Sequence, residues 1–397
     1  MTASAVRAAG IASPAGISGP STVLVDDGLI TAIVEGHPTV GDRKVVGDGR
    51  DVVAAGLIDI HTHGATGVQA IDGDPDGLTR LAAFYASHGV TGFLGTVGGS
   101  RAHIEDGIAA LTDLVRRGAE DDGSQCLGVH LEGPFISRCC PGAFRLDSIV
   151  RPDLATFEHF LSIANGALRL MTVAPEADGQ HDVIRAALAN GIVCSAGHSC
   201  ATDKQMLEAI ELGVTSLTHM FNAMPTLHHR QPGIVGVGLT DRRLTAELIA
   251  DGVHVHPTVV RLLALAKGWE GIALITDSIA AAGLADGTYD FEEQQIVVLH
   301  GEARLTDGTL AGSTLTLDRA VDNFAVFADV PWHHALASAS LVPARLLGIA
   351  DRKGSIEVGF DADLVGFDAE RNVNWTLVGG RVVFTRQAAG ANLWNAT

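Results

Sequence analysis

Histidines and carboxylates recur in short motifs that could together bind a divalent metal ion. The motifs HTHG, HLEGP, AGHS, THM and TDS supply His61, His63, Glu132, His198, His219 and Asp277. Ligands of this mixture suit Zn²⁺, Fe²⁺ or Mn²⁺. Such an ion polarises a carbonyl and brings the pKa of a bound water toward about 7, and an aspartate can take up and return the proton. The motifs therefore predict hydrolysis by metal-activated water, with Asp277 as the general base and acid.

No single motif carries this prediction. A lone histidine after a strand is more often a hydrogen-bonded structural residue, and the two ends of an H-x-H triplet share one side of any strand. The motifs are specific in combination and in this order. In contrast, His103, His181 and His300 stand outside any such motif, and we expect them to be structural.

Eight apolar runs are expected to be buried parallel strands, which appear as continuous apolar segments. The runs are Gly56–Ile60, Val90–Val97, Cys126–Leu131, Leu168–Val173, Ile192–Ala196, Val214–Leu217, Thr245–Ala250 and Ile272–Thr276. The motifs fall at the carboxyl ends of these runs, and His254 follows the seventh. Active sites of α/β barrels lie at that face, so distant residues are expected to share one pocket.

Helical patterns alternate with these runs. Gly77–His88 has apolar residues at helical spacing, Thr202 opens a capping box with Gln205, and Pro257 begins a helix that Gly268 ends. This alternation predicts an α/β fold, a (β/α)₈ TIM-like barrel over residues 55–350.

The two ends of the chain have a different pattern. Residues 1–54 and 351–397 carry short β-like segments separated by Gly and Asp turns, as in hairpins. We therefore expect a small β-sandwich-like domain formed from both termini.

The composition fits a large core and disfavours two kinds of partner. Of the 397 residues, 47% are hydrophobic and 18% are charged, and the net charge is −19. Nucleic-acid binding needs a basic face, which this charge disfavours. No signal-peptide pattern or membrane-spanning apolar run is evident, so we expect a cytoplasmic protein. A phosphorylated substrate would need local arginine and backbone N–H groups.

The five cysteines form no C-x-x-C pair, so we expect reduced thiols; they are Cys126, Cys139, Cys140, Cys194 and Cys200. For Cys139 and Cys140 we favour two free thiols in a mobile loop over soft metal ligation or redox gating.

The few lysines limit the kind of metal bridge. Lys44, Lys204, Lys267 and Lys353 are all the lysines, and none ends a predicted barrel strand. A carboxylated lysine is therefore excluded, and Glu132 is the expected bridge.

In order, HTHG, HLEGPF, GHS, THMFNAMP, GIVG, DGVHV, TDS and LAGS resemble the motifs of the N-acetylglucosamine-6-phosphate deacetylase family in the amidohydrolase superfamily. The resemblance implies one or two divalent ions: a metal on Glu132, His198 and His219, and, as in some members of the family, a second ion on His61 and His63. Zn²⁺ is the preferred metal, with Fe²⁺, Mn²⁺ and Co²⁺ as alternatives. It also implies a homodimer in which Arg230 can bind phosphate across the interface. The implied substrate-binding residues are Ala143, Asn222, Ala223, Arg230, His254, Leu310, Ala311 and Gly312.

One position departs from the family pattern. After HLEGPF the family usually has Gly-Ala-His, whereas this chain has Phe144 in place of the histidine. Phenylalanine cannot donate a hydrogen bond to a substrate. The departure leaves the reaction class in place and opens the choice of substrate.

The resemblance implies hydrolysis of N-acetyl-D-glucosamine 6-phosphate to D-glucosamine 6-phosphate and acetate. The nearest alternative is the same amide hydrolysis on N-acetylgalactosamine 6-phosphate or on a non-phosphorylated N-acyl compound. A non-catalytic sugar-phosphate binding protein is a further alternative, although the intact ligand set argues against it.

Overall fold

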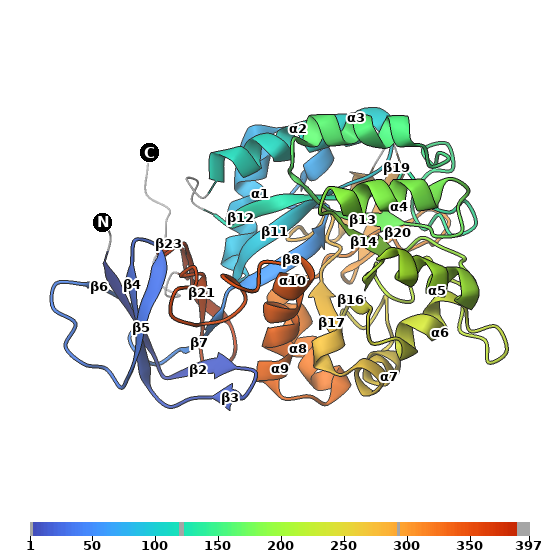
Figure 1. Ribbon diagram of the computed structural model, residues 1–397. Helices are drawn as coiled ribbons and strands as arrows, with labels where there is room; N and C mark the ends of the chain where they lie inside the picture. Colours follow the sequence, from blue (N-terminus) through green and yellow to red (C-terminus); the bar gives the residue numbers. More distant parts are fainter. Residues whose placement is uncertain (1–2, 119–122, 292–293, 387–397) are drawn as a thin grey trace.

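Eight parallel strands form a nearly closed barrel in the computed structural model, which describes residues 3–118, 123–291 and 294–386 (Figure 1). All eight predicted strands are confirmed. Their bounds are β8 (Leu57–Thr62), β11 (Val90–Val97), β12 (Gln125–Glu132), β13 (Leu168–Val173), β14 (Val193–Ala196), β15 (Ser216–Leu217), β16 (Thr245–Ile249) and β17 (Ile272–Ile275).

The first and last strands meet through bonds at the carboxyl end of the barrel. The Asp277 N–H donates to the His61 carbonyl at 2.8 Å, and the His63 N–H donates to the Ser278 carbonyl at 2.8 Å. Below them, the Thr276 hydroxyl donates to the Asp59 carboxylate at 2.6 Å. These bonds bring the motifs HTHG and TDS, which are more than 200 residues apart in sequence, side by side.

Helices surround the barrel (Figure 1). They are α1 (Pro75–Ser87), α2 (Arg101–Arg117), α3 (Leu154–Ala164), α4 (Gln180–Ala189), α5 (Asp203–Leu212), α6 (Gly233–Thr240), α7 (Pro257–Lys267), α8 (Leu317–Ala328), α9 (Trp332–Ser338) and α10 (Leu341–Leu346). The predicted capping box of Thr202 and Gln205 opens α5, and α7 begins at Pro257 as predicted. Among the helices that the structure describes, none combines the length and apolar character needed to cross a membrane.

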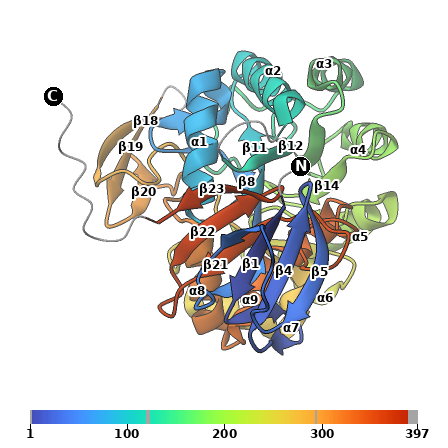
Figure 2. The ribbon, with the colours of Figure 1, turned by 90° about the vertical axis from the view of Figure 1, so that its left-hand side faces the viewer.

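Two antiparallel-rich sheets from the chain ends pack beside the barrel (Figure 2). Val23 and Val25 share a core with Leu364 and Trp375 of the other sheet, as a sandwich requires. One sheet has the order β5 (Leu29–Glu35), β4 (Ser21–Asp26), β1 (Ser4–Ala8) and β6 (Lys44–Val46). The other has β23 (Arg381–Thr385), β22 (Val373–Val378), β21 (Leu364–Phe367), β7 (Val52–Ala55), β2 (Gly10–Ser13) and β3 (Gly16–Ile17).

The exact domain boundaries stay a prediction. Strand β7 ends at Ala55 and belongs to the terminal sheet, while β8 begins the barrel at Leu57. The predicted small domain also includes residues 1–2 and 387–397, which lie outside the described residues.

A separate three-stranded sheet follows the last barrel strand and was not predicted. It contains β18 (Gly287–Phe291), β19 (Gln294–Leu299) and β20 (Glu302–Leu305). A small ladder of β9 (Gly64–Ala65) and β10 (Val68–Gln69) follows the first barrel strand. Phe291 and Arg304 of the three-stranded sheet line the pocket described next, so the sheet forms one of its walls.

Candidate active site

A pocket of about 300 Å³ brings most of the predicted site residues together. The predicted residues that line it are His63, Glu132, Ala143, His198, His219, Asn222, Ala223, His254, Asp277, Leu310 and Gly312. Gly142, Phe144, Ile279, Phe291, Arg304 and Thr309 complete the lining. His61 is fully buried beneath this surface.

Glu132 lies between the two pairs of histidines. Its Oε1 atom is 3.2 Å from His198 Nε2 and 3.0 Å from His219 Nε2. Its Oε2 atom is 3.3 Å from His61 Nε2 and 3.0 Å from His63 Nε2. The carboxylate therefore has the position of a bridge between two sets of imidazoles.

Two groups of three side chains each have donor atoms close enough to hold one ion. One contains Glu132, His198 and His219, and the other contains His61, His63 and Asp277. Asp277 Oδ1 is 3.5 Å from His61 Nε2 and 3.3 Å from His63 Nε2. The donors in each group lie within 4.8 Å of one another.

The orientation of the His61 and His198 rings, whose Nε2 atoms both lie near the Glu132 carboxylate, suits binding of a cation. His61 Nδ1 donates to the Glu247 carboxylate at 3.1 Å, and His198 Nδ1 donates to the Cys140 carbonyl at 3.1 Å. In its neutral form each ring then has a lone pair on Nε2. His61 Nε2 is buried without a hydrogen-bond partner among the described residues. The donor set fits a divalent ion.

The charges of the site keep its carboxylates ionised. Burial would raise the pKa of Glu132, but His61, His198 and His219 hold it well below its usual range. Asp277 behaves in the same way, because His61 and His63 lower its pKa against the effect of burial. Burial lowers the pKa of His63, yet Asp277 and Glu132 raise it to about 9. Both carboxylates are thus available as ligands or as a base.

Backbone turns aim three of these side chains across the barrel mouth. His198, His219 and Asp277 follow strand ends and have positive φ angles of 45°, 29° and 49°. Such angles are unfavourable for residues other than glycine and persist where surrounding structure enforces them, often at functional sites. A Cβ atom on Gly142 would lie 2.8 Å from His198 Cε1, so only glycine fits beside that ring.

Two glutamates support segments that carry the histidines, Glu247 by contact with His61 and His219 and Glu176 by contact with the residues after His198, and the sequence interpretation missed both. Glu247, which is fully buried, accepts bonds from His61 Nδ1 and from the His219 N–H at 3.3 Å. Glu176 accepts from the Ser199 hydroxyl and the Cys200 N–H, each at 2.6 Å. The signal for Glu247 was present, because a charged residue inside the apolar run TAELIA is unusual.

The histidine of the HLEGP motif has a structural role. His130 is fully buried, and its two ring nitrogens form hydrogen bonds with Thr96 at 3.1 Å and Thr172 at 2.9 Å. Burial, together with His61, holds the pKa of His130 well below its usual value. Both nitrogens are engaged, so His130 is not a ligand.

Two residues implied by the resemblance do not line the pocket. Arg230 is exposed on a loop, where its Nη1 atom is 2.7 Å from His229 Nε2. Ala311 is fully buried behind the wall that Leu310 and Gly312 form. Their roles in substrate binding stay predictions.

Polar contacts hold two of the lining residues. His254 Nδ1 donates to the Asp251 carboxylate at 2.7 Å, and the Asn222 side-chain amide donates to the His219 carbonyl at 3.2 Å. Phe144, the residue that differs from the family pattern, lies in the pocket. Its ring packs edge-to-face against that of His198, with 5.1 Å between the ring centroids.

The prediction of five reduced cysteines was wrong for two of them. Cys139 and Cys200 form a disulfide, whereas Cys126, Cys140 and Cys194 are free. The loops after β12 and β14 meet at the barrel mouth and bring together residues separated by 61 positions. Spacing in the sequence cannot reveal such a contact.

Comparison with known proteins agrees with this geometry. Residues 52–383 match the model of the amidohydrolase family. N-acetylglucosamine-6-phosphate deacetylase of Bacillus subtilis is 36% identical over 92% of this chain and 93% of its own length. N-acetylgalactosamine-6-phosphate deacetylase of Escherichia coli O157:H7 is 35% identical over 90% of this chain and 93% of its own length.

Among solved structures, a variant of N-acetyl-D-glucosamine-6-phosphate deacetylase from Mycobacterium smegmatis, in complex with N-acetyl-D-glucosamine-6-phosphate, superposes with a TM-score of 0.89. It is 30% identical, and the match covers 97% of this chain and 100% of that one. This chain therefore belongs to the N-acetylglucosamine-6-phosphate deacetylase family within the amidohydrolase superfamily.

Proposed function

We propose that this protein hydrolyses N-acetyl-D-glucosamine 6-phosphate to D-glucosamine 6-phosphate and acetate. The observation that carries the proposal is the position of Glu132 between two histidine pairs, with Asp277 beside it in the same pocket. This arrangement provides ligands for a metal and a carboxylate base within one cavity, as amide hydrolysis requires.

Glu132, His198 and His219 would hold one divalent ion, and His61, His63 and Asp277 would hold a second, with Glu132 as the bridge. We propose Zn²⁺, because histidine and carboxylate ligands suit it; Fe²⁺, Mn²⁺ and Co²⁺ are the alternatives. When bound, the ion supplies a Lewis acid for the acetyl carbonyl and lowers the pKa of water.

Asp277 would take the proton of the attacking water and return it to the departing amine nitrogen. Its low pKa keeps it unprotonated before the attack. Asn222, Ala223 and His254 would contact the sugar phosphate, with Ala143, Leu310, Ala311 and Gly312 shaping the sugar site. We also propose a cytoplasmic homodimer in which Arg230 binds the phosphate in the neighbouring subunit's pocket.

A second substrate is supported by a specific observation. The Escherichia coli relative named as an N-acetylgalactosamine-6-phosphate deacetylase is nearly as similar as the Bacillus subtilis one. In addition, Phe144 lines the pocket at a position where a hydrogen-bonding side chain could distinguish one sugar from the other. The two sugars differ at one hydroxyl, so the pocket wall would decide between them.

The test is acetate release by purified, metal-supplemented protein. The substrates are N-acetylglucosamine 6-phosphate, N-acetylgalactosamine 6-phosphate and unphosphorylated N-acetylglucosamine, and Asp277→Asn is the control. We expect the highest kcat/KM with N-acetylglucosamine 6-phosphate. A higher value with the galactose isomer would reassign the substrate, and tight binding of the two phosphorylated sugars without turnover would favour a sugar-phosphate binding protein.

A further inference from the structure

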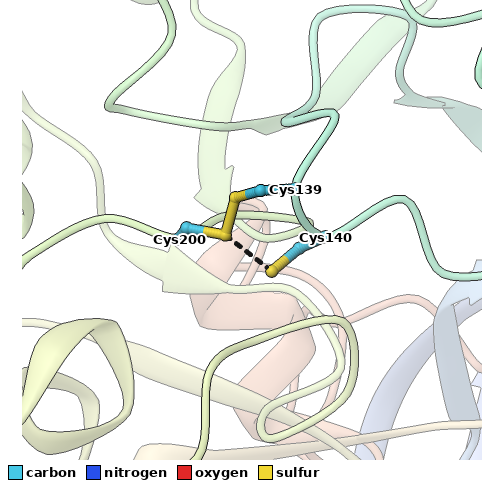
Figure 3. A group of neighbouring side chains, drawn as sticks. All are labelled: Cys139, Cys140 and Cys200. Carbon is cyan, nitrogen blue, oxygen red and sulfur yellow. Dashed lines mark hydrogen bonds between the residues drawn. A yellow bond between two sulfur atoms is a disulfide. The ribbon is translucent and has the colours of Figure 1, made fainter.

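Three cysteine sulfurs lie close together (Figure 3), and none of the three residues lines the pocket. Cys139 and Cys140 lie on the loop after β12, and Cys200 lies on the loop after β14, two residues beyond His198. The disulfide joins Cys139 to Cys200, and the Cys140 sulfur lies 2.9 Å from the Cys200 sulfur (Figure 3). The Cys200 sulfur thus contacts the sulfurs of two residues that are adjacent in sequence, Cys139 and Cys140.

We propose that this cluster is a thiol–disulfide exchange site in which Cys200 is the common partner of Cys139 and Cys140. In the exchange, the Cys140 sulfur forms a bond with the Cys200 sulfur as the Cys139–Cys200 bond breaks. Cys140 gives up its thiol proton and Cys139 gains one, so there is no net oxidation. A small-molecule disulfide is the class of oxidant that would form the first bond from three thiols, and a dithiol would reduce it.

The geometry of the two loops makes Cys200 the fixed partner. Its backbone N–H is held by the Glu176 carboxylate at 2.6 Å. The Cα atoms of Cys139 and Cys200 are 6.6 Å apart, near the upper end of the range that a disulfide spans. Since Cys140 is the next residue, with its Cα about 3.8 Å from that of Cys139, a small movement of its loop brings it within the same reach.

The exchange is coupled to a predicted metal ligand. The Ser137 N–H donates to the His198 carbonyl at 2.9 Å, and the Cys140 carbonyl accepts from His198 Nδ1 at 3.1 Å. The same turn therefore carries both the Cys140 thiol and the carbonyl that orients the His198 ring. Moving the disulfide from Cys139 to Cys140 shifts the Cys140 carbonyl. The two disulfide isomers should therefore differ in how firmly this carbonyl orients the His198 ring.

The remaining cysteines provide an internal control. Cys126 and Cys194 are buried in the barrel, and burial raises the pKa of each thiol to about 12. They should neither exchange nor react with alkylating agents in the folded protein. By contrast, Cys139 is exposed, and Cys140 and Cys200 are partly exposed, although burial and Glu176 also raise the pKa of the Cys140 thiol.

The experiment maps disulfides by alkylation and mass spectrometry after equilibration of the full chain with oxidised and reduced glutathione. The matched variants are Cys139→Ser, Cys140→Ser and Cys200→Ser. We expect Cys140–Cys200 in the first, Cys139–Cys200 in the second, and neither bond in the third. Alkylation of both Cys140 and Cys200 in oxidised Cys139→Ser would overturn the proposal. This readout does not depend on turnover, so it can fail or succeed separately from the proposed function.

A second measurement tests the coupling to His198. The oxidised Cys139→Ser and Cys140→Ser proteins are each compared with their dithiothreitol-reduced forms for metal affinity and kcat/KM. We expect about a tenfold difference between the two oxidised variants, which reduction removes. Equal values for the two oxidised forms would refute the coupling.

Discussion

His61 Nδ1 lies 3.1 Å from Glu247 Oε2 in a fully buried contact at the base of the site. Glu247 also accepts from the His219 N–H at 3.3 Å, so one carboxylate supports a histidine in each predicted ligand group. Partners of this kind fix the ring orientation and increase the basicity of a metal-binding imidazole.

Replacing Glu247 should therefore weaken metal binding without touching a ligand. We expect Glu247→Gln to lower metal affinity by about tenfold to a hundredfold, because one amide oxygen cannot serve all of its donors. The measurement is metal content after dialysis against a graded chelator, and thermal unfolding checks that the fold is retained. Unchanged affinity in a folded variant would contradict the positioning role of Glu247.

Asp277 should matter for proton transfer more than for substrate binding. We expect Asp277→Asn to reduce kcat by about 10²-fold to 10⁴-fold, because an amide cannot accept the proton of the attacking water. Steady-state kinetics, with metal content measured in parallel, check this. If kcat falls only as far as metal content does, Asp277 acts only as a ligand and does not also serve as the base.

The two predicted ion sites can be separated by their ligands. Among the described residues, His219→Ala removes one of the three side chains in its group, and His63→Ala removes one from the other. We expect His63→Ala to retain the ion held by Glu132, His198 and His219, whereas His219→Ala should lose that ion. Elemental analysis of each purified variant gives the stoichiometry. Equal loss in both variants would indicate a single shared site.

The sequence was sufficient for the parts of the fold that depend on local pattern. The eight barrel strands are continuous apolar runs, and Glu132, His198, His219 and Asp277 stand at or just beyond their ends. Barrel topology then requires these side chains to meet at one mouth. Caps such as Thr202 with Gln205 are also local, and they were predicted correctly.

Features that depend on contacts between distant loops were not predictable in this way. Cys139 and Cys200 are brought together only by the packing of two barrel loops. The sheet of β18, β19 and β20 follows the last barrel strand, where the βα repeat gives no expectation of strands. Glu247 is a different case, because a charged residue inside the apolar run TAELIA is a visible signal, whereas its partner His61 is revealed only by the fold.

Replacing Phe144 by histidine is expected to increase kcat/KM. Its ring lies against His198 in the pocket and offers no hydrogen-bond donor. We expect Phe144→His to raise kcat/KM for N-acetylglucosamine 6-phosphate by about tenfold or more, because a donor aimed at the reacting group stabilises the transition state. Phe144→Leu is the matched control for loss of the ring. Unchanged or reduced kcat/KM in the histidine variant would argue against this.

Arg230 tests whether the phosphate site is shared between subunits. It lies outside the pocket of its own chain, whereas Arg304 lines that pocket and is paired with Glu302 at 2.8 Å. We expect Arg230→Ala to raise KM for the phosphorylated sugar about tenfold or more, since a bidentate phosphate contact is lost, and to leave the unphosphorylated sugar unaffected. A larger effect from Arg304→Ala would place phosphate recognition within one chain.

Mixing two defective variants tests whether Arg230 acts across the subunit interface. In a symmetric dimer, subunits of Asp277→Asn and Arg230→Ala would combine so that some pockets contain both intact residues. If subunits exchange at random, roughly a quarter of all sites regain full function when the arginine acts across the interface. Recovery of acetate release on mixing, measured at low substrate concentration, is the expected result. No recovery, with subunit exchange verified by mass spectrometry, would mean that Arg230 acts within its own chain or has no role in phosphate binding.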